Sequence, residues 1–420
     1  MKITSLSRTF LMLLIALTAL SPFAVFAAQS SLMVAHPDWG TSPYGLSLKE
    51  LERQFQEEHP EVDLEAVTLN DPGGSTGGEG LFIRIAAGLI PDVVMMADTT
   101  LGELASLGAL TDLTSYRQRD NIPDNRFWPA GWNAVTVKGR TYGLPFVTDS
   151  RALIYNKDRL AMAGVAEIPT NLDSFDSLMA KLTTKNADGV ITHMGFWPEA
   201  GNWWLWGWGW LFGGRFMNAD LTQITANDPH IVSALEYEVS YAQRYGTPTR
   251  SYSLEDGTYT AMVHVSTAFA GLRQTAPDVE FGVSPIPSPA HSQSCTWSGV
   301  WTHAVPNGAQ NVELAWEYLK YMSDTHAQRY FSVQTTSVPT HAAAAGLVAR
   351  DLMAEYGPEV RTFIDIMPFS HTRPLSPITN KYWNVLQEYR QKAYRLELTP
   401  SQALDEVTRM LQSELDQILK

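Results

Sequence analysis

A run rich in tryptophan is the most unusual feature of the sequence. Residues 202–214 read NWWLWGWGWLFGG and contain five tryptophans. Each buried indole N–H needs an acceptor, so this run is difficult to bury whole, and a flat ring with a polar edge is what a sugar ring stacks on. A helix buried on both sides is the competing interpretation. We expect about three of the five rings in the core, with Trp203 and Trp204, beside polar Asn202, at the surface.

A second stretch combines an interrupted strand with charged residues. Residues 142–158 read YGLPFVTDSRALIYNKD, in which glycine and proline interrupt a strand that then resumes. Between the two halves stand Asp149, Ser150 and Arg151. Burying unpaired charge costs several kcal/mol, so a chain crossing between two lobes at this point should face a solvated cleft or a ligand. A surface turn with an ordinary Asp–Arg pair explains the same residues, and this stretch taken alone favours the turn.

Patterns typical of enzymes are scarce. Acidic residues are abundant, so a carboxylate pair for glycoside hydrolysis stays open as an alternative, but none sits in a recognisable motif. Ser298 lacks the flanking glycines of a nucleophile elbow. The ten histidines are scattered, with no HExxH or comparable pair. We therefore predict no catalytic residues, no metal site and no cofactor.

Composition indicates an exported protein of two lobes. A chain of 420 residues exceeds what one core usually fills. Residues 1–27 have a basic start, a short apolar run and small residues before Ala28, which predicts a secretory signal peptide cleaved near Ala27. No second long apolar stretch follows, so we expect no membrane insertion. Cys295 is the single cysteine, which excludes an internal disulfide and fits a bacterial periplasm.

The charge of the chain limits its partners. The formal net charge is −14, and removing residues 1–27, which hold two bases and no acid, would make it −16. An acidic surface argues against nucleic acid or an anionic membrane as partner. We expect a small-molecule ligand, and a monomer.

The elements that must position these residues alternate between strand and helix. Strands and helices alternate through the first hundred residues, a pattern typical of a sheet flanked by helices. Ser47 and Glu50 form a capping-box pattern that predicts a helix start. Near the C-terminus, Thr399 and Pro400 predict the start of a final helix with one apolar stripe.

Several segments, in order, resemble one family. They are RIAAGLIPDVVMM, LASLGALTDLT, YGLPFVTDSRALIYNKDRLAMAGV, the tryptophan-rich run, GTYTAMVHV, FGVSPIPSP, NVELAWEYLKYM and TPSQALDEV. Together they resemble the extracellular solute-binding proteins of bacterial ABC importers, in the carbohydrate-binding group that includes maltose-binding protein. The resemblance implies an α/β fold of the type II periplasmic binding protein kind, with two lobes, three inter-lobe crossings and a ligand cleft between the lobes.

The resemblance also implies ligand contacts. The acid six places before the tyrosine of YNKD contacts sugar hydroxyls in relatives, which points to Asp149, and an aromatic residue ahead of Gly213-Gly214 stacks on sugar, which points to Trp203. The loop after PDVVMM points to Met96, Asp98 and Thr99. Two departures, Met96 and Ser266 where relatives carry tryptophan, put a long glucan in doubt. The other candidate ligand-binding residues are Asp38, Trp39, Trp204, Gly299, Trp301 and Arg373.

The predicted lobes interleave along the chain. The first lobe is predicted over residues 28–146 and 266–336, and the second over residues 147–265 and 337–420. The function expected is that of a periplasmic protein that binds a sugar and delivers it to the permease subunits of an ABC importer. Two alternatives stay open: the same fold binding a glycerol phosphodiester or phosphorylated polyol, and a secreted carbohydrate-active enzyme using Asp149.

Overall fold

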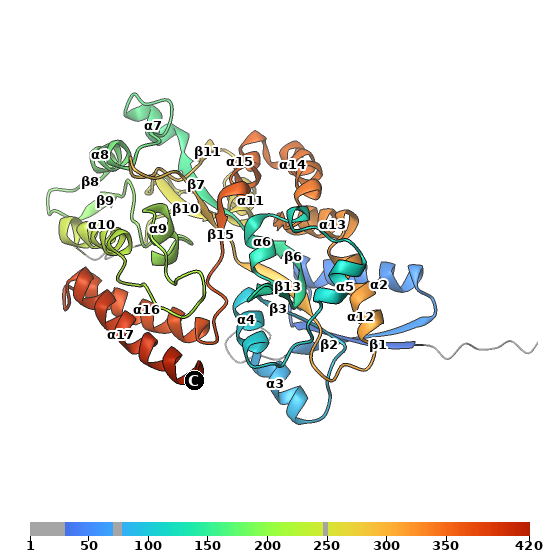
Figure 1. Cartoon of the computed structure of the whole chain (residues 1–420). Helices are drawn as coiled ribbons and strands as arrows, with labels where there is room; N and C mark the ends of the chain where they lie inside the picture. Colours follow the sequence, from blue (N-terminus) through green and yellow to red (C-terminus); the bar gives the residue numbers. More distant parts are fainter. Residues whose placement is uncertain (1–29, 70–77, 247–250) are drawn as a thin grey trace, which may run out of the picture.

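The structure, a computed structural model, describes residues 30–69, 78–246 and 251–420. The predicted signal peptide, residues 1–27, lies outside the described residues. Figure 1 shows two lobes, each with a sheet and flanking helices, which confirms the predicted two-lobed α/β fold. Within the described ranges, no helix is both long enough and apolar enough to cross a membrane.

The first lobe is built on a six-stranded mixed sheet. β1 runs parallel to β2 and β3, whereas β13 runs antiparallel to β3 and β6, and β14 runs antiparallel to β6. In spatial order the strands are β14 (Val338–Pro339), β6 (Gly143–Thr148), β13 (Val300–Ala304), β3 (Val93–Ala97), β1 (Ser30–Pro37) and β2 (Val62–Leu69).

Side chains of β3 alternate between two cores, one on each face of this sheet. Val93 and Met95 enter one apolar cluster, whereas Val94 and Met96 enter the other. This period of two is what a sheet covered on both faces requires. The covering helices are α2 (Pro43–Glu58), α12 (Val312–Met322) and α13 (Thr325–Thr335) on one face, and α3 (Gly78–Ala86) and α4 (Asp98–Ser106) on the other.

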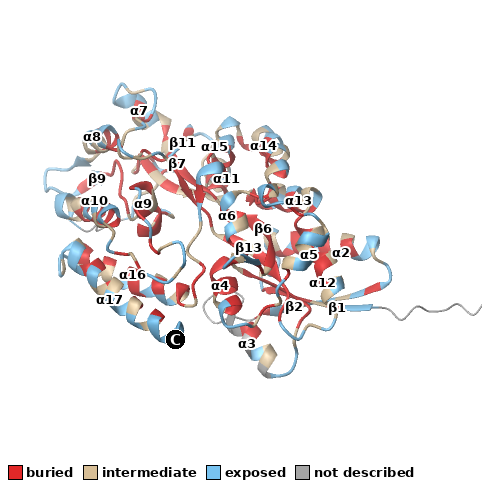
Figure 2. Cartoon of the chain, in the orientation of Figure 1, coloured by how far each residue is buried: buried red, intermediate tan, exposed pale blue. Residues whose placement is uncertain are grey.

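The second lobe packs helices around a smaller antiparallel sheet and one large apolar cluster. The sheet has the order β10 (Ala261–Val265), β7 (Arg151–Asn156), β11 (Phe281–Ser284). Figure 2 shows buried residues in both sheets and exposed residues along the outer sides of the helices. The helices are α7 (Lys157–Met162), α8 (Leu172–Leu182), α9 (Leu205–Leu211), α10 (Pro229–Tyr245), α11 (Ser266–Thr275), α14 (Ala342–Tyr356), α15 (Arg361–Asp365), α16 (Thr379–Tyr394) and α17 (Pro400–Ile418).

Short elements complete the chain. Two parallel strands, β12 (Thr296–Trp297) and β15 (Ser370–His371), pair with each other beside the point where the lobes meet. The others are the hairpins β4 (Thr136–Val137) with β5 (Arg140–Thr141) and β8 (Thr184–Lys185) with β9 (Ile191–His193), the helices α5 (Thr114–Arg119) and α6 (Pro129–Asn133), and the 3₁₀ turns η1 (Asp124–Arg126), η2 (Pro358–Val360) and η3 (Met367–Phe369).

The chain passes between the lobes where β6 leads into β7, where β12 leads into β13, and where β14 leads into α14. The predicted return to the first lobe at residue 266 is wrong. β11 forms hydrogen bonds with β7, and Phe269 of α11 belongs to the core of the second lobe, so residues 266–297 stay in that lobe. The return crossing lies instead at residues 298–299, which brings it beside the first crossing at Asp149 and Ser150.

Candidate functional site

Arg151 ties together the chain segments that meet between the lobes. Its side chain is 4% exposed, and Nη1 donates to Asp149 Oδ1 at 2.6 Å and to the Trp297 carbonyl oxygen at 2.7 Å. Nε donates to the Asn202 carbonyl oxygen at 2.8 Å, and Nη2 donates to Asn202 Oδ1 at 3.0 Å. Burial lowers the pKa of Arg151, and the charge of Asp149 opposes that shift. Directed donors on fixed acceptors hold the three segments in one arrangement.

Asp149 is the accessible member of this ion pair, with a side chain that is 32% exposed. Its Oδ1 also accepts a hydrogen bond from the Gly299 N–H at 2.8 Å. The pKa of Tyr44 is raised to about 12 by burial and, to a smaller extent, by the charge of Asp149, so the carboxylate also lies near the first lobe. Asp149 is therefore fixed in orientation while part of it stays free for a ligand.

Three tryptophans of the second lobe form what we call the aromatic wall: Trp204, Trp297 and Trp383. Their ring centroids lie 5.3 Å apart for Trp204 and Trp297, 5.0 Å for Trp204 and Trp383, and 5.8 Å for Trp297 and Trp383. The Arg151 guanidinium carbon lies 4.0 Å from the Trp297 ring centroid. Trp204 and Trp383 are half-buried. The rings are thus held by one another and by a cation, with two of them reaching the surface.

The first lobe contributes a second aromatic group from the ends of its strands. Trp39 follows β1, and its ring centroid lies 5.0 Å from that of Trp301 on β13 and 5.2 Å from that of Tyr44. Trp39 and Trp301 are half-buried. Trp301 pairs with Ala97 at the carboxyl end of β3, the edge where open sheets present ligand contacts.

A second arginine and carboxylate lie beside the aromatic wall. Asp98, the first residue of α4, is 0% exposed and accepts hydrogen bonds from Thr372 Oγ1 at 2.5 Å and from Arg373 Nη2 at 3.1 Å. The Arg373 guanidinium carbon lies 5.6 Å from the Trp297 ring centroid and 5.4 Å from that of Trp383. Both arginines near the wall are therefore paired with a carboxylate.

The predicted exposure of Trp203 is wrong. This side chain is 0% exposed, and its ring lies against Gly207, where a Cβ atom would come within 2.4 Å of the ring. Trp206 and Trp208 are buried as well, whereas Trp204 and Trp210 are half-buried. Three of the five rings are thus in the core, as expected, but Trp203 is one of them.

Other candidates from the sequence are placed as follows. Met96 is 0% exposed and packs in the core, so the prediction that its side chain contacts a ligand is wrong. Thr99 and Ser266 are buried, and Ser266 Oγ donates to the Thr336 carbonyl oxygen at 2.8 Å. Asp38 is exposed and accepts a hydrogen bond from the Gly40 N–H, next to Trp39. Trp204 is part of the aromatic wall, and Asp149, Gly299 and Arg373 lie around it.

The sequence reasoning missed four residues of this site. Arg151 was passed over in favour of Asp149, and Asn202 was noted only as a polar neighbour of the tryptophan run. Trp297 and Trp383 were not considered. Trp297 stands four positions before Trp301 in TWSGVW, a signal that was available, whereas Trp383 lies in a helix whose local pattern does not distinguish it from a core residue.

The site offers no obvious place for a metal. Among residues 30–69, 78–246 and 251–420, no three or more His, Cys, Asp or Glu side chains gather as a metal ion would need. Ser298 is buried, and its Oγ donates to Met367 Sδ at 3.8 Å, whereas its backbone N–H donates to the His371 carbonyl oxygen at 2.8 Å.

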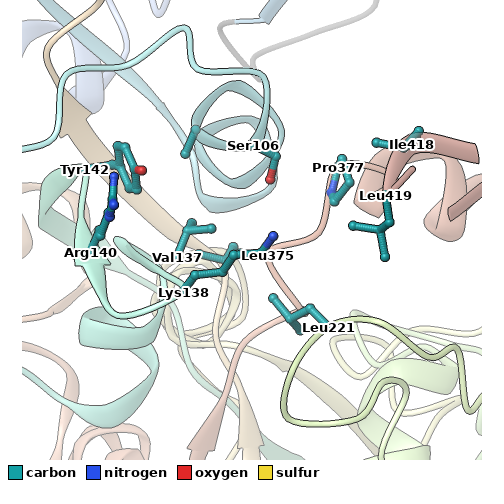
Figure 3. A pocket seen from close by; sticks show the side chains of 11 residues that line it. Ser106, Val137, Lys138, Arg140, Tyr142, Leu221, Leu375, Pro377, Ile418 and Leu419 are labelled. Atoms are coloured by element: carbon teal, nitrogen blue, oxygen red, sulfur yellow. The ribbon is translucent and has the colours of Figure 1, made fainter. Parts of the chain in front are cut away.

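Two cavities lie near the junction of the lobes. One, of about 410 Å³, is lined by Trp210, His371 and Pro374 among others and adjoins the aromatic wall, because the Trp210 ring centroid lies 6.4 Å from that of Trp297. The other, of about 490 Å³, is shown in Figure 3. There Arg140 and Tyr142 lie on one side and Ile418 and Leu419, at the end of α17, on the other, with Lys138 and Ser106 between them, so residues of both lobes line it.

Comparisons with known proteins agree with one another. The sequence model described as bacterial extracellular solute-binding protein matches residues 39–329. The maltotriose-binding protein of Pyrococcus abyssi is 23% identical over 319 residues, which cover 73% of this chain and 66% of that protein, just under two thirds of its length.

Solved structures of similar fold cover more of the chain. The sugar-binding protein MalE of Xanthomonas citri matches with a TM-score of 0.79 at 18% identity, over 92% of this chain and 98% of that one. CpMnBP1 with mannotriose bound matches with a TM-score of 0.74 at 23% identity, over 92% of this chain and 100% of that one.

Proposed function

We propose that this chain, which belongs to the bacterial extracellular solute-binding protein family, binds a neutral oligosaccharide between its lobes and delivers it to the permease of an ABC importer. The observation that carries the proposal is the aromatic wall at the junction of the lobes, with the fixed but partly exposed Asp149 beside it. The names of the maltotriose-binding relative and of the sugar-bound structural neighbours support the choice of ligand class.

The chemistry of the site suits a sugar. A pyranose ring presents a C–H face that stacks on indole and hydroxyls that need fixed acceptors and donors. The half-buried rings of Trp204 and Trp383 supply the stacking surface. The Asp149 carboxylate, held by Arg151, supplies an acceptor for the hydroxyls. A hydroxyl missing from a wrong ligand would leave Asp149 unpaired, which is how such a site discriminates.

The phosphodiester alternative fits less well. A phosphate ligand needs a cation whose charge is not already neutralised. Arg151 is paired with Asp149, and Arg373 is paired with Asp98. The net charge of these four groups is zero, which favours a neutral ligand.

The enzyme alternative fits less well at Asp149, the residue that it would use. Asp149 and Asp98 each accept hydrogen bonds from an arginine, whereas a catalytic pair needs one carboxyl group ready to give up a proton. The chain thus acts as a binding protein in this proposal. It is exported by a signal peptide cleaved near Ala27, works in the periplasm as a monomer, and closes its lobes on the ligand before docking on the permease.

A saccharide panel tests the proposal. Thermal unfolding is followed with maltotriose, mannotriose, mannobiose and other neutral oligosaccharides, and product formation is followed in the same samples. A ligand at 100 times its dissociation constant should stabilise the fold by about 2.7 kcal/mol without turnover. Trp383→Ala should lose that stabilisation, whereas Trp132→Ala, which removes a half-buried ring packed near Arg117, should keep it. Reproducible turnover that Asp149→Ala abolishes would establish an enzyme instead.

A further inference from the structure

Asp98 carries a buried charge whose partners come from a distant part of the chain. Its Oδ2 accepts from Thr372 Oγ1, and its Oδ1 accepts from Arg373 Nη2 and, at 2.8 Å, from the N–H of Thr99. The residue is 0% exposed. With three donors and no accessible surface, this carboxylate has no face left for a ligand, so a direct contact, as the family resemblance implies, does not explain why a charge is buried here.

Arg373 is the group through which Asp98 can influence a ligand. Its side chain is 16% exposed and lies against both Trp297 and Trp383 of the aromatic wall. Its Nε is buried and has no hydrogen-bond partner among the described residues. An arginine with donors to spare beside a stacking surface would attract anionic ligands if its charge were free.

We propose that Asp98 is a specificity-determining residue that neutralises Arg373 and thereby makes the site select neutral ligands over anionic ones. This inference rests on the proposed function, because it assumes that the ligand lies on the aromatic wall. Specificity of this kind works by exclusion: the cation is present for its packing and hydrogen bonds, and the carboxylate cancels its attraction for uronic acids or phosphorylated sugars.

The charge of Asp98 can be removed without removing its contacts. In Asp98→Asn, the amide oxygen still accepts from the Thr99 N–H and from Arg373, and the amide NH₂ can donate to Thr372 Oγ1, because a hydroxyl is also an acceptor. The same interface keeps two further contacts. Asn380 Nδ2 donates to Glu103 Oε2 at 2.9 Å, and Gly102 lies against Leu375. The substitution thus isolates charge from geometry.

The test is a titration of the full mature chain, by calorimetry, with inorganic phosphate, glucose 1-phosphate and a neutral saccharide from the panel. Asp98→Asn should bind both anions at least about 10-fold more tightly than wild type, and added salt should weaken that binding. The double variant Asp98→Asn with Arg373→Gln should return to wild-type values. Glu103→Gln, which removes a carboxylate from the same helix without touching Arg373, should bind the anions as wild type does.

The outcomes separate this inference from the proposed function. Equal anion affinity in wild type and Asp98→Asn would overturn the inference, as would a gain that survives the loss of Arg373. The phosphate arm needs no sugar, so a wild type that binds none of the neutral saccharides counts against the proposed function alone. Should Asp98→Asn unfold, Asp98→Ser gives the same comparison with a smaller side chain that keeps one acceptor.

Discussion

At the scale of single residues, the site depends on buried groups whose charges are matched. Arg151 is the clearest case, because it holds Asp149, the Trp297 carbonyl oxygen and Asn202 at once. A buried ion pair is weak support for stability by itself, yet removing one partner leaves the other charged and unpaired. In this site the pair fixes the direction of the Asp149 carboxylate, which is partly exposed.

Arg151→Met should therefore destabilise the protein strongly. We expect the free energy of unfolding to fall by about 3–5 kcal/mol, because the Trp297 and Asn202 carbonyl oxygens lose a buried donor and Asp149 loses its ion-pair partner. Urea denaturation followed by tryptophan fluorescence measures the change. Arg361→Met, which breaks an exposed pair with Asp365, should change it by less than about 1 kcal/mol. Similar effects for the two variants would show that the Arg151 cluster is no more than a surface pair.

Glu52 predicts a pH dependence of stability. This carboxyl group on α2 is 6% exposed, and burial raises its pKa from 4.5 to about 7, while its Oε1 lies 3.7 Å from His36 Nε2. At Glu52, the folded protein therefore binds more protons than the unfolded chain between pH 4.5 and 7. The stabilising contribution of protonated Glu52 is complete below pH 4.5 and is lost as the pH rises through 7.

Glu52→Gln should remove this dependence. From pH 5 to pH 8.5, the variant should gain about 2–3 kcal/mol of stability relative to wild type. Chemical denaturation at both pH values gives the difference, in which the contribution of His36 largely cancels. Glu65→Gln, on the exposed side of β2, is the control and should follow wild type at both. A constant difference between Glu52→Gln and wild type across this range would contradict the assignment.

At the scale of elements, close approach of α4 to the segment before α16 joins the lobes. A Cβ atom on Gly102 would lie 2.8 Å from Leu375 Cβ and 2.9 Å from its Cα. Because a backbone atom is among these neighbours, no side-chain rotation relieves the clash. The contact needs glycine for space and not for an unusual backbone angle.

Gly102→Ala should accordingly lower the free energy of unfolding by about 1–3 kcal/mol through overpacking. Gly271→Ala in α11 is a matched control, since nothing lies within 4 Å of its added Cβ, and it should raise stability by about 0.5–1 kcal/mol through helix propensity. Thermal and urea unfolding of the two variants measure the expected loss and the expected gain of stability. If Gly102→Ala were as stable as Gly271→Ala, the close approach would not be present in solution.

Local sequence patterns predicted helices better than they predicted which strands pair. The cap at Thr399 and the stripe of α17 were predicted and are present, because capping and helical period are local. The helix start predicted at Ser47 is too late, since α2 begins at Pro43 with Ser42 as its cap, and Ser42 stands five residues before Ser47. The return crossing was wrong because the pairing of β11 with β7 is set by contacts distant in sequence.

The candidate site likewise contains residues that local sequence predicts and residues that only the packing of distant segments brings together. Asp149 and Arg373 are recognisable as polar residues at turns. Which tryptophan reaches the surface depends on how α9 packs. Gly207 packs against the Trp203 ring, and no local sequence pattern predicts that contact. Trp383 joins the wall only through the position of α16 against β12.

At the scale of the whole molecule, ligand binding should protect Cys295 through the equilibrium between folded and unfolded protein. This thiol is buried in the core of the second lobe, and burial raises its pKa to about 12. Labelling by a thiol reagent then reports unfolding. A saccharide at 100 times its dissociation constant should slow labelling by about 100-fold, because it binds only the folded state. The denatured protein should label at once, and a rate independent of ligand would show that the saccharide does not stabilise the fold.

The sheet of the first lobe also bears on how the chain is made. Val338 on β14 pairs with Thr148 on β6, and β13 fills the place between β6 and β3, so the sheet lacks both strands until synthesis reaches the last third of the chain. Such non-local pairing makes folding slow. If the chain is exported as proposed, this delay would help it pass through a translocation channel, because its N-terminal half cannot form a finished first lobe by itself.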